Sequence, residues 1–146
     1  MFLKIKGGFM KTKYFKYAKN MAQMSEFNKF KVGCVVVYKN KIIGQGYNSD
    51  KTHPLQQMYN HLRFEDDGVS PHKLHAEMHA LIPIRNLDID WSKVSVYIYR
   101  IKKSNSLGFG MARPCASCMG LIRKLGVRYI NYTTEEGIAS EIIYKK

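Results

Sequence analysis

Two cysteines and a distant histidine have the types and spacing of a metal site. Cys115 and Cys118 are three residues apart, and on a helix residues three apart share a face, so both sulfurs can reach one ion. At a helix start, the positive end of the helix dipole favours a thiolate. His75 can supply a third ligand, which leaves the fourth position of a zinc ion open for water, as in catalytic zinc sites.

A carboxylate lies close to the histidine in the sequence. Glu77 follows His75 by two residues, and at a helix start the two side chains can flank an ion placed beyond the helix end. Glu77 would then face the water without binding the metal, which is the position of a proton shuttle. A structural zinc site, a redox-active cysteine pair and chance spacing are the alternatives to this interpretation.

Hydrophobic periodicity predicts the elements that position these residues. An apolar stripe that includes Tyr14, Ala18 and Met24 predicts a helix over 13–25. The almost wholly apolar segment 32–38 predicts a strand buried on both faces, and Cys34 lies within it. The further predicted elements are a returning strand at 42–47, a short helix after Pro54, a helix at 74–82 that ends at Pro83, a strand at 94–101, a helix at 115–125, a strand at 127–132 and an edge strand around 142–144.

This order of elements predicts an α/β fold of three layers, in which a mixed, roughly five-stranded sheet is flanked by helices. The 146 residues fit a single domain. Residues 1–11 read as a loose N-terminal leader. Residues 49–74 form a long segment between two strong motifs, and we interpret them as an insertion near the active site.

The motifs resemble those of the zinc-dependent cytidine deaminase superfamily. His75-Ala76-Glu77 and Pro114-Cys115-Ala116-Ser117-Cys118 match its two half-motifs in order. The strand pair before them, which ends in Gly46-Tyr47-Asn48, is similar to that of deoxycytidylate deaminases. The resemblance implies that His75, Cys115 and Cys118 bind Zn²⁺ and that Glu77 is the general acid and base.

The resemblance also implies substrate contacts and an assembly. The backbone N–H of Ala76 and the carbonyl next to Pro114 would hold the water and the leaving amine. Asn48 would hydrogen-bond the sugar or the base, and Arg113 is a candidate phosphate or base contact. Members of the superfamily usually form homo-oligomers, and we expect the same here. The segment 49–74 is longer than in the smallest nucleoside and tRNA deaminases, which leaves the choice of substrate open.

Charge and composition restrict the partners. The net charge of +13 favours an anionic partner, either a small nucleotide or a nucleic acid. No apolar run approaches the roughly 20 residues needed to cross a bilayer, so we expect no membrane partner. Three cysteines without a secretory signal argue against structural disulfides and predict a cytoplasmic protein.

Three functions remain as hypotheses. The first is a hydrolytic deaminase that converts a cytosine-type nucleotide or nucleoside, similar to dCMP, to its uracil form with release of ammonia. The second keeps this chemistry but acts on a base within tRNA or single-stranded DNA, as the +13 charge allows. The third is a zinc-stabilised module that binds nucleic acid without catalysis.

Overall fold

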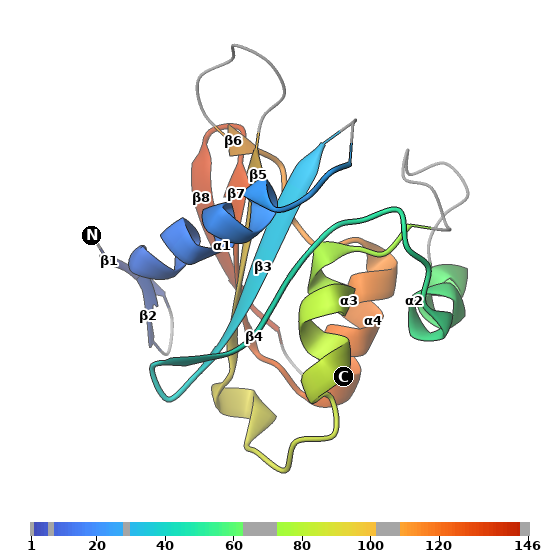
Figure 1. The fold of residues 1–146 in the computed structure, drawn as a ribbon. Coiled ribbons are helices and arrows are strands. Elements are labelled where there is room, and N and C mark those ends of the chain that lie inside the picture. The colour runs from blue at the N-terminus through green and yellow to red at the C-terminus, as the bar shows by residue number, and fades with distance from the viewer. Residues whose placement is uncertain (1, 6–7, 28–29, 63–72, 102–108, 144–146) are drawn as a thin grey trace.

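The computed structural model describes residues 2–5, 8–27, 30–62, 73–101 and 109–143. A mixed sheet runs through the centre of the molecule (Figure 1). Its strands, in spatial order, are β4 (Lys41–Tyr47), β3 (Lys31–Tyr38), β5 (Ser95–Ile101), β7 (Tyr129–Thr134) and β8 (Gly137–Ile142), and the short β6 (Phe109–Gly110) pairs with β5. This arrangement confirms the predicted mixed sheet.

The strand directions follow from the connections. β3 and β4 are joined by a tight turn in which Lys39 and Asn40 both have positive φ, and they pair antiparallel. A helical crossover separates β5 from β7, and these two strands pair parallel, as the alternation of helix and strand predicts. β8 returns antiparallel on β7 as an edge strand. It covers 137–142, whereas the sequence placed this strand around 142–144.

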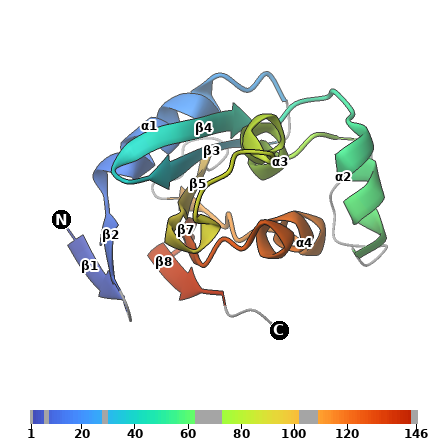
Figure 2. The ribbon, with the colours of Figure 1, turned by 90° about the horizontal axis from the view of Figure 1, so that it is seen from below.

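Helices cover both faces of the sheet (Figure 2). α1 (Lys13–Gln23) lies on one face, and α3 (Ala76–Leu81) and α4 (Ala116–Leu125) lie on the other. α2 (Pro54–Tyr59) lies beside α4 at the outer edge of that layer. Single 3₁₀ turns occur at Asn60–Leu62, Ile82–Ile84 and Trp91–Lys93. The second follows the last residue of α3, Leu81, and contains Pro83, the residue expected to end this helix.

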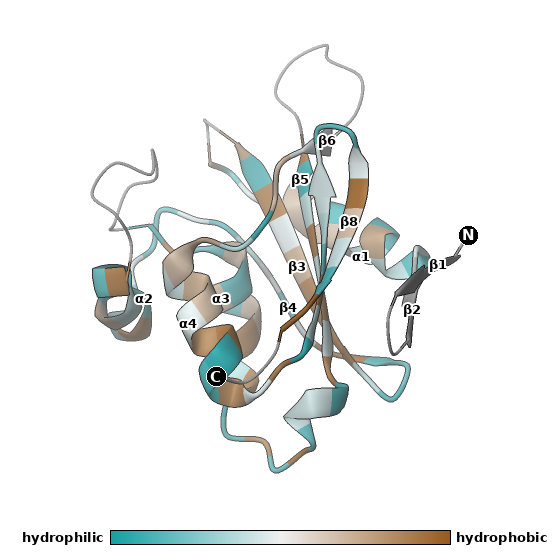
Figure 3. Ribbon diagram, turned by 180° about the vertical axis from the view of Figure 1, so that it is seen from behind, coloured by the Kyte–Doolittle hydropathy of each residue, from teal (hydrophilic) through white to brown (hydrophobic). Residues whose placement is uncertain are grey.

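The alternation of side chains along β3 divides the core between the two faces. Val35 and Val37 pack with the residues of α1, whereas Cys34 and Val36 belong to the larger cluster under α3 and α4. β3 is therefore buried on both faces, as its apolar sequence predicts. Hydrophobic and hydrophilic residues alternate along α4 in Figure 3, which is the pattern of a helix with one face on the sheet.

In two helices the buried face differs from what apolar spacing predicts; for the helix after Pro54, that spacing would bury Leu55, Met58, Tyr59 and Leu62. In α1, the buried side chains include Phe15 and Ala22, while Tyr17 and Met24 are exposed. In α2, Tyr59 is buried but Met58 is exposed, and a polar residue takes the inner position. In α1, the close approach of Gly33 leaves room only for small side chains at Ala18 and Ala22. In α2, the inner polar side chain is hydrogen-bonded to the backbone of His75 and to Ser117.

The N-terminal segment differs from its prediction, and two long internal segments are described only in part. Residues 1–11 were expected to be loose, but β1 (Phe2–Ile5) and β2 (Gly8–Lys11) form an antiparallel hairpin of their own. In the segment 49–74, the helix after Pro54 is present. The sequence also predicts a break at Asp66-Asp67-Gly68 and a loop over 102–113, and all of the first and most of the second lie outside the described residues.

Glycines allow the helices to approach the sheet closely. A Cβ at Gly33 of β3 would lie 2.0 Å from the carbonyl oxygen of Ala18 in α1. A Cβ at Gly46 of β4 would lie 2.6 Å from the backbone nitrogen of Ala80 in α3. These contacts are with backbone, which cannot move aside as a side chain can. The position of α3, and of the residues at its start, is therefore fixed by β4.

Candidate active site

The predicted metal ligands meet where two helices begin. His75 is the N-cap residue of α3 and Cys115 is the N-cap residue of α4, with Cys118 one turn further on. The Nδ1 atom of His75 lies 3.3 Å from the Sγ atom of Cys115 and 3.3 Å from that of Cys118. Three candidate ligand atoms therefore converge from two separate elements, although the residues are 40 positions apart in the chain.

This geometry fits a zinc ion. Zn–S and Zn–N bonds of about 2.3 and 2.1 Å in a tetrahedron place sulfur and nitrogen about 3.6 Å apart, close to the observed distance. The three ligand atoms lie within 4.8 Å of one another. Cys34 is buried in β3 and is not part of this group. His75, Cys115 and Cys118 could therefore hold one zinc ion and leave one position open.

The two thiols differ in their protonation. Hydrogen bonds from Cys118 and then His75 lower the pKa of Cys115 to about 3, so this sulfur is a thiolate at neutral pH. Burial raises the pKa of Cys118, and the neighbouring Cys115 raises it further. Cys118 therefore stays a thiol beside the Cys115 thiolate; a metal ion bound between the two sulfurs would replace its proton and offset the repulsion between two thiolates.

Glu77 lies in the first turn of α3, and its side chain is buried at 6% exposure. Burial raises the pKa of this carboxyl to about 7, against the opposing effect of His75. Such a group exchanges a proton readily near neutral pH. Glu77 also lines the same pocket as His75 and Cys115.

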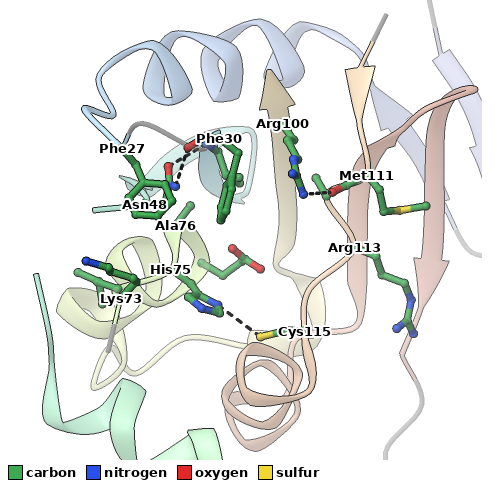
Figure 4. A pocket seen from close by; sticks show the side chains of 14 residues that line it. Phe27, Phe30, Asn48, Lys73, His75, Ala76, Arg100, Met111, Arg113 and Cys115 are labelled. Carbon is green, nitrogen blue, oxygen red and sulfur yellow. Dashed lines mark hydrogen bonds between the residues drawn. The ribbon is translucent and has the colours of Figure 1, made fainter. Parts of the chain in front are cut away.

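Aromatic and basic side chains form the mouth of this pocket (Figure 4). Phe27 and Phe30 make an edge contact with ring centroids 5.0 Å apart. The guanidinium of Arg100 lies 4.6 Å from the ring centre of Phe30, and the Lys73 ammonium lies 5.8 Å from that of Phe27. Lys73 also pairs with Asp50 at 2.7 Å. Phe27, Phe30 and Arg100 come from distant segments that share no motif, so the sequence alone does not indicate that they line this pocket.

Asn48 is buried against the pocket and holds the loop that carries Phe30. Its Oδ1 accepts a hydrogen bond from the backbone nitrogen of Val32 at 2.9 Å, and its Nδ2 donates to the carbonyl of Phe30 at 3.0 Å. An amide has two N–H donors and two acceptor sites, so one of each remains for a ligand. Asn48 lines the pocket, and its contact with substrate stays a prediction.

The remaining predicted contacts lie around the start of α3 and α4. Ala76 lines the pocket at the first residue of α3. Pro114 is buried between two residues that line it, Arg113 and Cys115. The Arg113 guanidinium makes two hydrogen bonds, of 2.7 and 3.2 Å, to the carboxylate of Glu141 in β8. Arg113 is therefore engaged in an ion pair, and its contact with substrate stays a prediction.

Two further polar residues touch the metal-binding segments. Gln56 of α2 and Ser117 of α4 are both almost fully buried, with exposed fractions of 1% and 0%. Gln56 hydrogen-bonds the backbone of His75 and the hydroxyl of Ser117. In the sequence, Gln56 is one polar residue among several in an amphipathic segment, so no local pattern distinguishes it from its exposed neighbours.

Residues 10–134 match the family model described as the cytidine and deoxycytidylate deaminase zinc-binding region. A comparison with curated protein sequences finds no match. Among solved structures, the dCMP deaminase of cyanophage S-TIM5 in complex with dCMP and dUMP is 26% identical, with a TM-score of 0.55 over 84% of this chain and 82% of that one.

A second solved structure supports the fold alone. The cytidine deaminase of Burkholderia pseudomallei is 16% identical, with a TM-score of 0.59 over 91% of this chain and 93% of that one. The family model covers most of the chain, including both half-motifs and the strand pair that precedes them. The chain therefore belongs to the zinc-dependent cytidine and deoxycytidylate deaminase family.

Proposed function

We propose that this protein is a hydrolytic deaminase of a free cytosine nucleotide, with dCMP as the model substrate. The observation that supports this most directly is one pocket that joins a His-Cys-Cys metal site, the buried Glu77 and basic side chains at its mouth. Membership of a deaminase family argues against the third hypothesis, a zinc module without catalysis.

The proposed roles follow from position. His75, Cys115 and Cys118 hold the metal ion, which as a Lewis acid makes water a nucleophile near neutral pH. Glu77 takes a proton from the water that attacks C4 of the base and delivers it to N3. Glu77 next takes the remaining proton from the oxygen now bound to C4 and passes it to the exocyclic amine; the C4–N bond breaks as the C4=O bond forms, and ammonia leaves. A carboxyl with a pKa of about 7 suits both the acceptance and the return of the proton.

The pocket mouth supports a nucleotide over a nucleoside. Arg100 and Lys73 can present positive charge to a phosphate, while Phe27 and Phe30 offer aromatic surface to a base or sugar. The 26% identical phage structure contains dCMP and dUMP. Asn48 and the backbone of Ala76 complete the proposed set of substrate contacts, with the carbonyl next to Pro114 and Arg113 at the rim.

The test is ammonia release from cytosine and adenine nucleosides, their mono- and triphosphates, guanine, single-stranded DNA and tRNA. We expect dCMP to react and the Glu77→Gln variant to lose about 10²- to 10⁴-fold in rate. The matched control is Glu136→Gln, an exposed glutamate that should leave the rate unchanged. Zinc-loaded protein that leaves every cytosine compound unchanged would refute the proposal.

A polynucleotide substrate is the second candidate, and the net charge of +13 favours it. Binding to tRNA or single-stranded DNA releases counterions, so its affinity should fall steeply as salt rises. Turnover of a mononucleotide that involves one phosphate should change far less. A steep loss of turnover between 50 and 200 mM salt, together with inert mononucleotides, would favour this candidate over the first.

A further inference from the structure

A buried glutamine connects the two halves of the metal site. The Oε1 atom of Gln56 accepts a hydrogen bond from the backbone nitrogen of His75 at 3.2 Å. Its Nε2 atom donates to the hydroxyl of Ser117 at 3.2 Å and to the Oδ1 atom of Asn60 at 2.9 Å. One side chain of α2 therefore contacts both the segment that carries the histidine and the segment that carries the cysteines.

The direction of each hydrogen bond follows from the donors present. A backbone nitrogen can only donate, so Oε1 of Gln56 must face His75 and Nε2 must face Ser117. The Ser117 oxygen accepts from Gln56, which directs its single hydroxyl proton elsewhere. The Sγ atom of Cys115 lies 2.9 Å from this oxygen and accepts that proton as a thiolate. The hydrogen bonds therefore form a series in which Gln56 donates to Ser117 and Ser117 donates to Cys115.

Packing holds this series of hydrogen bonds in place. Gln56 and Ser117 are almost fully buried, so bulk water does not compete for their hydrogen bonds. α2 approaches α4 closely at Gly120, where a Cβ would lie 2.5 Å from Cδ1 of Leu62 and 2.8 Å from Cδ1 of Tyr59. The segment 49–62 therefore places the Gln56 amide against the metal site by direct helix contact.

We propose that Gln56 and Ser117 are positioning residues of the metal site, in which Gln56 orients the Ser117 hydroxyl toward the Cys115 thiolate and also holds the backbone of His75. The hydrogen bond lowers the charge that the thiolate donates to the metal, which sets the energy of the charge-transfer band. It also fixes the direction of the sulfur, and this orientation favours metal binding. Partners of this kind typically change metal affinity by about 10- to 100-fold. The inference rests on the proposed metal site and is independent of the substrate.

The test uses protein loaded with Co²⁺, whose thiolate-to-metal charge-transfer band reports the charge on the sulfur, together with zinc affinity from chelator competition. Ser117→Ala removes the donor, so the band should move to lower energy and zinc affinity should fall about 10-fold. Gln56→Met should move the band in the same direction by a smaller amount. Gln57→Met, at an exposed position of the same helix, should match the wild type.

The double variant separates positioning from simple destabilisation. In the Ser117→Ala background, Gln56→Met should no longer move the band, because it acts through the serine hydroxyl. A band that Gln56→Met leaves at the wild-type energy, or shifts equally in both backgrounds, would overturn the inference. If Gln56→Met does not fold, Gln56→Asn, which shortens the side chain by one methylene, takes its place with the same criteria.

Failure of the positioning role can be distinguished from failure of the proposed deaminase function. A protein that deaminates nothing but shows the expected band shifts would support the positioning role and refute the activity. A protein that deaminates dCMP but whose charge-transfer band is unchanged by Gln56→Met would support the activity and refute the positioning role.

Discussion

At the residue scale, the metal site depends on the start of each helix. His75 and Cys115 both have extended backbone conformations at an N-cap, which turns their side chains away from the helix axis and toward each other. This explains how Glu77, two residues after His75, can line the same pocket without belonging to the ligand group. On a continuous helix, positions i and i+2 would point in different directions.

His75→Ala should abolish stoichiometric zinc binding. Loss of a residue that only hydrogen-bonds a ligand typically lowers metal affinity by about 10- to 100-fold. Loss of the ligand itself should lower zinc affinity by more. The control is His79→Ala: His79 lies one turn later and hydrogen-bonds the backbone of Tyr47, outside the ligand group. Zinc content per chain, measured by atomic emission after dialysis, should be near zero for the first variant and unchanged for the second. Equal zinc content in both would contradict the site.

At the element scale, close backbone contacts fix α3 relative to the sheet. Gly46→Ala would place a methyl group against the backbone of Ala80, 2.6 Å away, and against His79. We expect a loss of about 1–3 kcal/mol in the free energy of unfolding, together with weaker zinc binding, because α3 carries His75.

The matched control for this prediction is Gln45→Ala, an exposed position in the same strand. Urea unfolding of the zinc-loaded proteins gives the free energies, and chelator competition gives the affinities. A Gly46→Ala protein as stable as Gln45→Ala would show that the helix can move without cost.

The Arg113–Glu141 pair links the loop before α4 to β8 and should give a pH-dependent contribution to stability. Hydrogen bonds from Arg113 lower the pKa of Glu141. In the unfolded chain this carboxyl has a pKa near 4.3, and in the folded protein its pKa is lower. The ion pair therefore stabilises the fold above pH 4.3, and this stabilisation is lost as the pH falls through the folded-state pKa. Because both side chains are at least a third exposed, solvent screening limits the effect to about 0.5–1 kcal/mol.

Glu141→Gln should therefore lower the unfolding free energy at pH 7, and the difference from wild type should vanish at low pH. The measurement is urea unfolding at several pH values between 3 and 7, with Glu135→Gln as the exposed control. A difference that grows as the pH falls would contradict the assigned sign.

At the scale of the whole molecule, the metal site joins α3 and α4 across the core layer that covers one face of the sheet. None of the helices in the described part of the chain is long and apolar enough to cross a membrane. Assembly into a homo-oligomer and a cytoplasmic location stay predictions from the sequence.

Removal of zinc should lower the thermal stability of the whole chain. A ligand that binds only the folded state adds about 4 kcal/mol when its concentration is 1,000 times its dissociation constant. Calorimetry of the zinc-loaded and chelated protein should show a fall in the midpoint temperature that zinc restores. Glu77→Gln, which keeps all three ligands, should show the same fall. Identical midpoints with and without chelator would contradict a metal bridge between α3 and α4.

The sequence alone was enough to predict the order of most elements, the mixed sheet and the His-Cys-Cys group with Glu77 beside it. These predictions rest on local information: the period of apolar residues and the motif spacing at helix starts. The zinc chemistry is encoded in the same short segments, so their residues could be identified before the fold was known.

Only the tertiary structure decided which residues surround that chemistry. Gln56, Phe30 and Arg100 come from separate segments and carry no local pattern, yet packing brings them to the metal site or the pocket mouth. The small residues in the buried stripe of α1, Ala18 and Ala22, likewise answer to the close approach of Gly33. Contacts between elements far apart in the chain depend on how those elements dock, and short-range periodicity does not record that docking.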